Sequence, residues 1–359
     1  MAAEFHATAG EAQAMISLYV LGLAIGHLVY GPVADSFGRR PVMLVGLAAY
    51  TVASLASALV TALDALVVTR MLQALGGCAA MVLARTIVRD TSGNSDAIRR
   101  LAQMNLMVTI APVLGPIVGG FIAPSAGWRA ISLLLAAFGS AALVLAWRLL
   151  PETRDAATQL SAVELRRHYG RLVRSRIFIA LALGGGCATT SMYAFIVAAP
   201  FVFVNQLHRP IQEVGVYLAV LISGVWLGNA FTSRLAGKVP ADWLLVRANA
   251  LSLAAALVLL AASLAGELSV PGVVASMFAL TVGVGMAAPL ALTRAISIHP
   301  EVTGSAAGLY GAIQMAVGSV SMMLAGLGQD AAIAASLVLV GAGLMSQLAF
   351  WLTLRRPLR

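Results

Sequence analysis

Few residues of this chain could take part in chemistry, because only 10% of its 359 residues are charged and 60% are hydrophobic. The densest group of charges is the stretch GPVADSFGRRP at 31–41, which sets Asp35, Arg39 and Arg40 between two long apolar runs. Carboxylate and guanidinium groups so close together suit ion pairs and contacts with helix ends. This stretch therefore predicts a switchable polar contact rather than a bond-making site.

Other residue types that support catalysis are sparse. The two cysteines, Cys78 and Cys187, both lie inside apolar runs and have no metal-ligand or disulfide spacing. We find no Walker-type Gly-rich loop for ATP. The sequence therefore predicts no catalytic residue, no metal site and no bound cofactor, and we expect that the chain is not an enzyme.

The apolar runs decide the fold class. Mean hydropathy is +0.92, whereas an ordinary soluble domain is roughly a quarter charged. The runs are about twenty residues long, which fits helices crossing a hydrocarbon core of about 30 Å. Strands of a membrane barrel would instead show alternating segments of about ten residues. We expect an all-α integral membrane protein.

Eleven spans are predicted. They are 13–34, 42–60, 66–88, 101–123, 128–149, 177–203, 212–233, 243–265, 270–293, 302–326 and 331–353. The connections are short except for 150–176, which is polar and Arg-rich. We interpret this segment as a cytoplasmic amphipathic linker between two halves.

Basic residues fall mostly in the loops of one side. This bias predicts that side to be cytoplasmic, with the N-terminus outside and the C-terminus inside. The net charge of +9 then belongs to a membrane surface, and no nucleic-acid partner is expected.

Three motifs resemble those of a known family. The opening stretch reads G-x-x-x-D-x-x-G-R-R, with Gly31, Asp35, Gly38, Arg39 and Arg40 in place. It resembles the signature loop of the major facilitator superfamily, between helices two and three of the usual twelve. The alternative is ordinary turn chemistry with a positive-inside bias.

The other two motifs agree. RMLQALGG at 70–77 resembles the fourth-helix motif of that superfamily. APVLGPIVGG at 111–120 resembles the fifth-helix motif of its drug/proton antiporters, with Ala111 in place of the usual first glycine. Its matching residues are Gly115, Pro116, Gly119 and Gly120. GWR at 127–129 and LLPETR at 149–154 are most similar to the Bcr/CflA multidrug-resistance exporters.

The resemblance implies two helical bundles around a central cavity, with eleven of the twelve helices present. Residues 1–150 would form the first bundle, 151–176 the linker and 177–359 the second bundle. The first twelve residues are similar to the external segment after helix one. We therefore expect the chain to be N-terminally truncated, without helix one.

A cytoplasmic gate is expected from Gly31, Asp35, Gly38, Arg39, Arg40 and Asp90. Asp35 would lie near the N-terminal end of a helix starting near Glu301 to Gly304, where the helix dipole favours a carboxylate. Arg39 would pair with Asp90. Arg40 would face lipid phosphates or serve the positive-inside bias.

Arg70 lies at roughly 6 Å of axial depth in its span, given a rise of about 1.5 Å per residue. An intramembrane charge usually faces a cavity or a partner, although it could snorkel to the headgroups. With Gln73 three residues on, we favour a cavity-facing role in proton coupling or anion binding. His27 could titrate near neutral pH, or simply line the cavity or pack between helices.

Two further sets are candidates. The glycines and proline of the fifth-helix motif would make a hinge or seal, or be generic membrane-helix residues. A substrate cavity could use aromatic and polar side chains in the second half, for which helix packing is the alternative. Its candidates are Tyr193, Phe195, Asn229 and Gln314.

The function expected from the resemblance is proton-coupled efflux of small amphipathic drugs or metabolites by alternating access. The protein would be a monomer in the bacterial inner membrane. Two alternatives remain open at this stage. The chain could be a non-transporting remnant or membrane interaction protein, or a metabolite importer of the same fold.

Overall fold

The computed structural model describes residues 9–91, 94–153, 162–235, 238–298 and 303–354, and within these ranges the regular structure is helical with no strand. The predicted all-α membrane fold is confirmed for this part of the chain. Ten helical stretches in it are long and apolar enough to cross a bilayer. The expected span at 101–123 lies within a longer helix, where the side chains of 101–113 are outside the description.

The helices follow the predicted spans closely. They are α1 (Ala9–Phe37), α2 (Arg39–Leu59), α3 (Leu63–Thr91), α4 (Asn94–Leu149), α5 (Ala162–Arg174), α6 (Arg176–Thr190), α7 (Met192–Pro200), the π-helix η1 (Phe201–Gln206), α8 (Ile211–Leu235), α9 (Ala241–Ala265), α10 (Val270–Ile296), α11 (Thr303–Gly326) and α12 (Ala331–Leu354).

Two predicted boundaries differ in detail. The spans expected at 101–123 and 128–149 both fall in α4, which bends at Gly127, a residue with φ 77°. The span expected at 177–203 is divided into α6, α7 and η1. Pro200 has no N–H to donate, so the hydrogen-bond ladder is interrupted where the π-helix begins.

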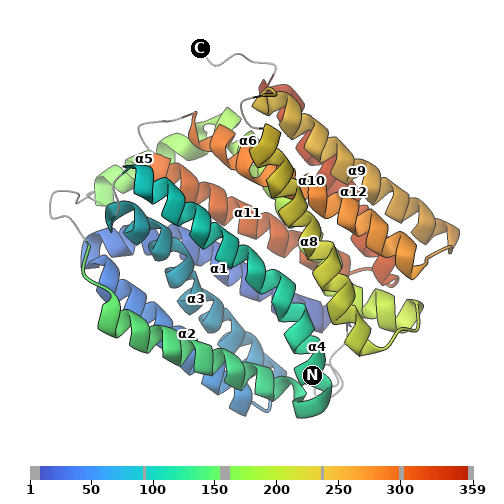
Figure 1. Ribbon diagram of the computed structural model, residues 1–359, viewed down its shortest axis with the longest axis horizontal. Coiled ribbons are helices and arrows are strands. Elements are labelled where there is room, and N and C mark those ends of the chain that lie inside the picture. The colour runs from blue at the N-terminus through green and yellow to red at the C-terminus, as the bar shows by residue number, and fades with distance from the viewer. Residues whose placement is uncertain (1–8, 92–93, 154–161, 236–237, 299–302, 355–359) are drawn as a thin grey trace.

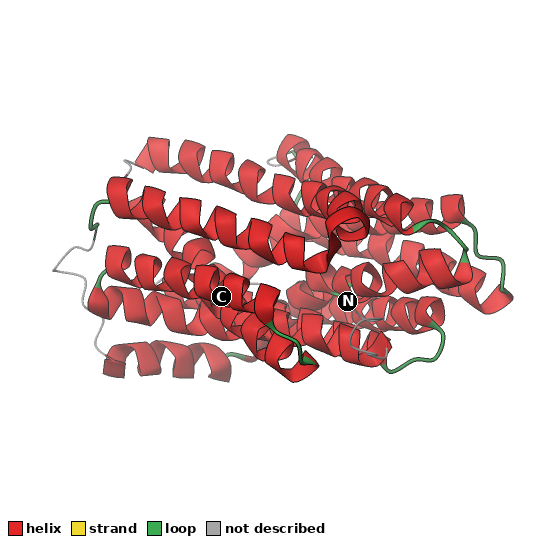
Figure 2. Cartoon of the chain, turned by 90° about the horizontal axis from the view of Figure 1, so that it is seen from below, coloured by secondary structure: helices red, strands yellow, loops and turns green. Residues whose placement is uncertain are grey.

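The chain forms two groups of helices that meet along a seam (Figure 1). Helices α2 and α3 pack within the first group and α6–α12 mainly within the second, whereas α1 and α4 each contact both groups. The seam consists chiefly of α1 against α11 and of α4 against α8. Seen from below, most helices run in the same general direction, as expected of membrane-crossing segments (Figure 2).

Helix α5 belongs to the predicted linker and is amphipathic. Leu172 is fully buried against the second group, whereas Arg167 and Arg174 on the same helix are exposed. The Tyr169 hydroxyl reaches the backbone oxygen of Leu28 in α1 at 3.5 Å. The linker helix thus touches both sides of the seam.

Small residues allow the helices to approach closely. A Cβ atom at Gly228 of α8 would overlap the backbone of Val282 in α10, and one at Gly285 of α10 would overlap Val225 in α8. Lipid tails are as apolar as the side chains, so membrane helices associate through close packing rather than through a hydrophobic driving force. The α8–α10 crossing is therefore specified by these two glycines.

We expect Gly228→Ala to destabilise the protein by about 1–3 kcal/mol, since the added methyl group would overpack a backbone contact. The measurement is thermal unfolding of the purified protein in detergent. Gly341→Ala is the matched control, because a Cβ there meets no described atom within 4 Å. Equal unfolding temperatures for the two variants would contradict this account of the crossing.

Candidate functional site

The signature loop at 31–41 joins α1 to α2 through a single residue. Gly38 has φ 96°, a conformation that glycine adopts without the strain that a side chain would cause. Its N–H donates to the Ala34 oxygen at 3.0 Å, which closes α1. Arg39 then begins α2, and its side chain is buried.

Glu152 covers the start of α2. One carboxylate oxygen accepts the Arg39 backbone N–H at 3.0 Å, and the other accepts that of Arg40 at 3.2 Å. The first N–H groups of a helix have no partner within it, and its N-terminus favours a negative charge. The segment after α4 is therefore bound to the loop by a charge-assisted cap.

Arg40 adds a second connection, since its Nη2 donates to the Trp147 backbone oxygen at 2.8 Å. Sequence reasoning had not assigned Glu152 a role. A carboxylate in the LLPETR run could have suggested a helix cap, but its partner helix begins 113 residues earlier.

Several predicted gate contacts lie outside the described side chains. These are the ones that involve Asp35, Asp90 and residues 301–304. The contacts of Asp35 with a helix end and of Arg39 with Asp90 therefore stay predictions. Gly31 lies within α1, where a Cβ atom would meet no described atom within 4 Å.

Arg70 is the centre of a polar cluster inside the first group of helices. Its Nη1 donates to the Gln73 side-chain oxygen at 3.0 Å, and its Nη2 lies 3.4 Å from the Ser132 hydroxyl of α4. The Gln73 amide in turn donates to the Ser54 hydroxyl of α2 at 2.6 Å. Three helices thus hold one guanidinium in a fixed place.

The described neighbours of Arg70 are uncharged. Tyr19 of α1 and Tyr50 of α2 lie within electrostatic range of it, and its hydrogen-bond partners are an amide and a hydroxyl. Among the described side chains, no carboxylate forms an ion pair with it. The cluster therefore holds a net positive charge among α2, α3 and α4.

His27 lies on the seam. Its Nδ1 is 2.8 Å from the Leu23 oxygen of its own helix and 3.3 Å from the Cys78 sulfur of α3. On the other side it faces Gly311 of α11, where a Cβ atom would come within 2.9 Å of the ring. An imidazole here touches both groups of helices.

The four cavity candidates of the second half are not placed together. Gln314 of α11 donates to the Thr189 hydroxyl at 2.7 Å. Tyr193 packs with Val20 of α1 at the seam.

The other two lie elsewhere. Phe195 is fully buried in the core of the second group, edge-to-face with Phe203 at 6.4 Å between ring centres. Asn229 is exposed and donates to the Val225 oxygen of its own helix at 3.0 Å. We retain Tyr193 and Gln314 as cavity candidates and interpret Phe195 as a packing residue.

The fifth-helix motif reaches the seam at its end. A Cβ atom at Gly120 would lie 3.6 Å from the Gln212 oxygen and 3.7 Å from the Gly215 Cα of α8. Gly115 and Gly119 have no described atom within 4 Å of such a Cβ, and the Pro116 side chain is outside the description. Gly120 is the residue of this motif with a described seam contact.

Comparison with known proteins decides the family. The sequence profile of the Major Facilitator Superfamily matches residues 1–322. The chain belongs to this superfamily. The resemblance inferred from the motifs is thereby confirmed, and two groups of helices meeting along a seam accord with it.

Several curated relatives of this superfamily member carry multidrug-transport or drug-resistance names. It is 29% identical over 237 residues to the multidrug transporter MdfA of Yersinia pestis, covering 66% of this chain and 58% of that protein. It is 30% identical to a chloramphenicol resistance protein of Pseudomonas aeruginosa, covering 84% and 72% of the two chains. A bicyclomycin resistance protein homolog of Haemophilus influenzae is 23% identical, with 97% and 88% covered.

Solved structures agree on the fold. A D-xylose–proton symporter superposes with a TM-score of 0.76 at 17% identity, covering 96% of this chain and 88% of the other. The identity is low, so this likeness concerns architecture alone. The matched region of this chain corresponds to only 58% of the length of the MdfA protein.

We expect Glu152→Ala to destabilise the protein by about 1 kcal/mol, since loss of a helix cap leaves N–H groups without a partner. Glu152→Gln keeps one acceptor oxygen and should lose less. Thermal unfolding in detergent is the measurement, with Glu267→Ala in the exposed loop before α10 as the control. A Glu152→Ala protein as stable as the control would mean that the cap is not stabilising.

Proposed function

We propose that this chain is a proton-coupled exporter of small amphipathic compounds that works by alternating access in the bacterial inner membrane. Membership of the superfamily and the drug-resistance names of its relatives support transport of small molecules. The observation that carries the proposal is the Arg70 cluster, because it holds a charge in the membrane interior. No covalent step is involved, so the protein is not an enzyme.

A guanidinium at this depth is costly unless it meets a partner in the working cycle. Arg70 is held by neutral groups from α3 and α4, while Gln73 is fixed in turn by Ser54. These bonds position the charge without neutralising it. It can therefore attract an anionic or carbonyl group of a substrate, or a carboxylate whose protonation drives transport.

Tyrosine side chains add an aromatic surface beside the positive charge of Arg70. Tyr19 lies near Arg70, and it also packs at the seam beside Tyr193 and Val20. An aromatic wall next to one fixed charge suits compounds with an apolar body and a polar group. The amide of Gln314 lies on the opposite side of the seam, one turn from Gly311, as a candidate second polar contact.

Alternating access requires that the two groups of helices separate at one end while they close at the other. The seam between α1 and α11 has contacts suited to this. At one end the Ser319 hydroxyl donates to the Ser17 oxygen at 2.7 Å. Nearer the other end, His27 faces Gly311. These two contacts lie toward opposite ends of the seam, so one could break while the other forms as the two groups of helices rock.

The gate is proposed at the basic side, which we take as cytoplasmic, with the N-terminus outside and the C-terminus inside. Here Asp35 would meet the N-terminal end of the helix that starts near 301–304, and Arg39 would pair with Asp90, when the side closes. Glu152 fixes the backbone of the same loop, so the end of α4 would move with it. We treat residues 1–150 and 177–359 as the two rocking units and the protein as a monomer, with protons and a drug-like compound as its partners.

The alternatives are less well supported. A non-transporting remnant would have no need of a fixed charge at the Arg70 depth. A metabolite importer of the same fold would fit the likeness to the D-xylose–proton symporter, which concerns fold alone. The antiporter-type motif at 111–120 and the names of the curated relatives favour export.

We expect Arg70→Ala to lower chloramphenicol resistance about tenfold, since a hydrogen bond to a charged group contributes about 1.5–3 kcal/mol. The assay uses cells deleted for their own drug pumps, with membrane levels of each variant measured. Arg70→Lys keeps the charge but loses the planar guanidinium with its parallel N–H donors, and should give partial resistance. Arg209→Ala, at an exposed arginine before α8, is the control. Full resistance with both Arg70 variants would refute the assigned role.

We expect a cross-link between Ser17→Cys and Ser319→Cys to stop efflux, since it would tie α1 to α11 at a point where they now touch. Fluorescent-substrate efflux is measured in oxidised and reduced cells, and reduction should restore it. Each single cysteine variant serves as the control. Undiminished efflux by fully cross-linked protein would mean that the seam does not open there.

A further inference from the structure

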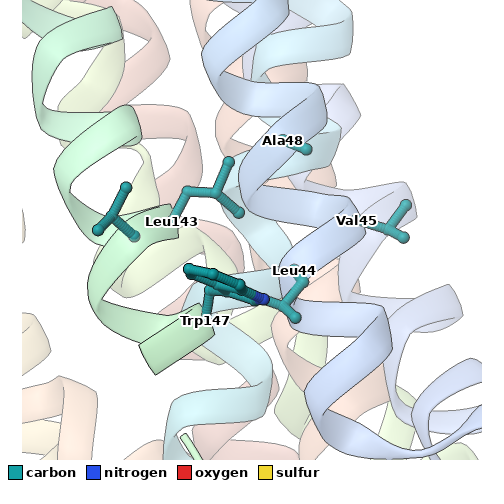
Figure 3. Close-up of a pocket in the computed structure, with 6 residues that line it drawn as sticks. Leu44, Val45, Ala48, Leu143 and Trp147 are labelled. Atoms are coloured by element: carbon teal, nitrogen blue, oxygen red, sulfur yellow. The ribbon is translucent and has the colours of Figure 1, made fainter. Parts of the chain in front are cut away.

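An apolar groove lies on the outer surface of the first group of helices, away from the Arg70 cluster. It has a volume of about 450 Å³ and runs between α2 and α4. Its lining residues are Leu44, Val45, Ala48, Leu143, Val144 and Trp147. Figure 3 shows the Trp147 ring and Leu143 facing Leu44 between the two helices, with Val45 on the outer side of α2. A volume of this size is ordinary for a small-molecule site.

The groove opens outward. Val45 is 71% exposed, and Trp147 is 61% exposed. Both helices are apolar enough to cross the bilayer, so this surface faces hydrocarbon. An occupant of the groove must therefore be apolar along most of its length.

One end of the groove is cationic. Arg40 lies one helical turn before Leu44 and two turns before Ala48, so the three share one face of α2. Arg148 lies one turn beyond Val144 on α4. The Arg40 guanidinium is held at this end by the Trp147 oxygen at 2.8 Å. The groove thus runs from an apolar surface to an end that carries the positive charges of Arg40 and Arg148.

Two polar atoms at this end lack a hydrogen-bond partner within the described part of the chain. They are the Nε of Arg40 and the hydroxyl of Thr153, and both are buried. The nearby Glu152 carboxylate accepts the backbone N–H groups of Arg39, Arg40 and Thr153. Because both atoms are buried, an acceptor from outside would have to meet the Arg40 guanidinium at its other N–H groups.

We propose that this groove binds an anionic phospholipid, with one acyl chain along Leu44, Ala48 and Leu143 and the phosphate at the Arg40 and Arg148 end. Trp147 would lie at the level of the headgroup and the first carbons, where tryptophan is favoured in membranes. The anionic headgroup is chosen because Arg40 and Arg148 both lie at that end.

The site also reaches the signature loop. Arg40 provides both the groove's cationic end and, through its backbone N–H, a contact of the Glu152 cap. A lipid held there would fix the relative position of α2 and the end of α4. It can bind whether or not the chain exports drugs, so the two proposals can fail separately.

The test is quenching of Trp147 by brominated phospholipids in a variant whose other four tryptophans are replaced by phenylalanine. The purified protein is reconstituted with brominated phosphatidylglycerol or brominated phosphatidylcholine. We expect about a fivefold preference of the Trp147 site for phosphatidylglycerol, which corresponds to about 1 kcal/mol for a basic residue near an anionic lipid. A matched protein that keeps only Trp226, 42% exposed in the middle of α8, should show a ratio near one.

Two variants of the Trp147 protein sharpen the result. Arg40→Gln should abolish most of the preference, whereas Arg247→Gln, at an exposed arginine of α9, should leave it unchanged. Ala48→Phe fills the groove and should reduce quenching by both lipids. The proposal is overturned if Trp147 and Trp226 give the same ratio, or if Arg40→Gln keeps the full preference.

Discussion

A charge inside hydrocarbon is costly unless it has a partner or reaches water, and this cost governs where the chain places its polar residues. Most charged side chains lie at the ends of helices. Arg70 of α3 lies about two turns from the start of its helix, as Arg247 of α9 does, and Arg70 is held by polar side chains. Its amide and hydroxyl partners are held by other helices, so the packing of α2, α3 and α4 decides where the charge lies.

The need to give every polar group a partner also explains the structure of the signature loop. Its backbone N–H groups at the start of α2 would have no partner in a helix that begins so abruptly after Gly38. Glu152 satisfies them from a segment more than a hundred residues away. One carboxylate thus fixes the backbone of a loop of a few residues.

Close packing complements the polar contacts. Glycines at the α8–α10 crossing bring two backbones together, and Gly311 makes room for His27 at the seam. The interior of each group is held by broad apolar contact, and α1 also packs extensively on α11 across the seam.

Sequence alone determined the helical membrane class, the approximate spans and the family, because runs of about twenty apolar residues and the motif at 31–41 are local patterns. It also singled out Arg70 and Gln73, whose spacing of three places them on one helix face. Only the tertiary structure decided the partners. The Glu152 cap, the Ser132 and Ser54 contacts and the groove beside Trp147 join residues far apart in the chain. Phe195 is a residue whose role the sequence could not decide. An aromatic residue beside a helix break has the same local pattern whether it lines a cavity or fills a core. Which of these it does depends on how the helices pack, and the sequence of one segment does not specify which helices pack against it.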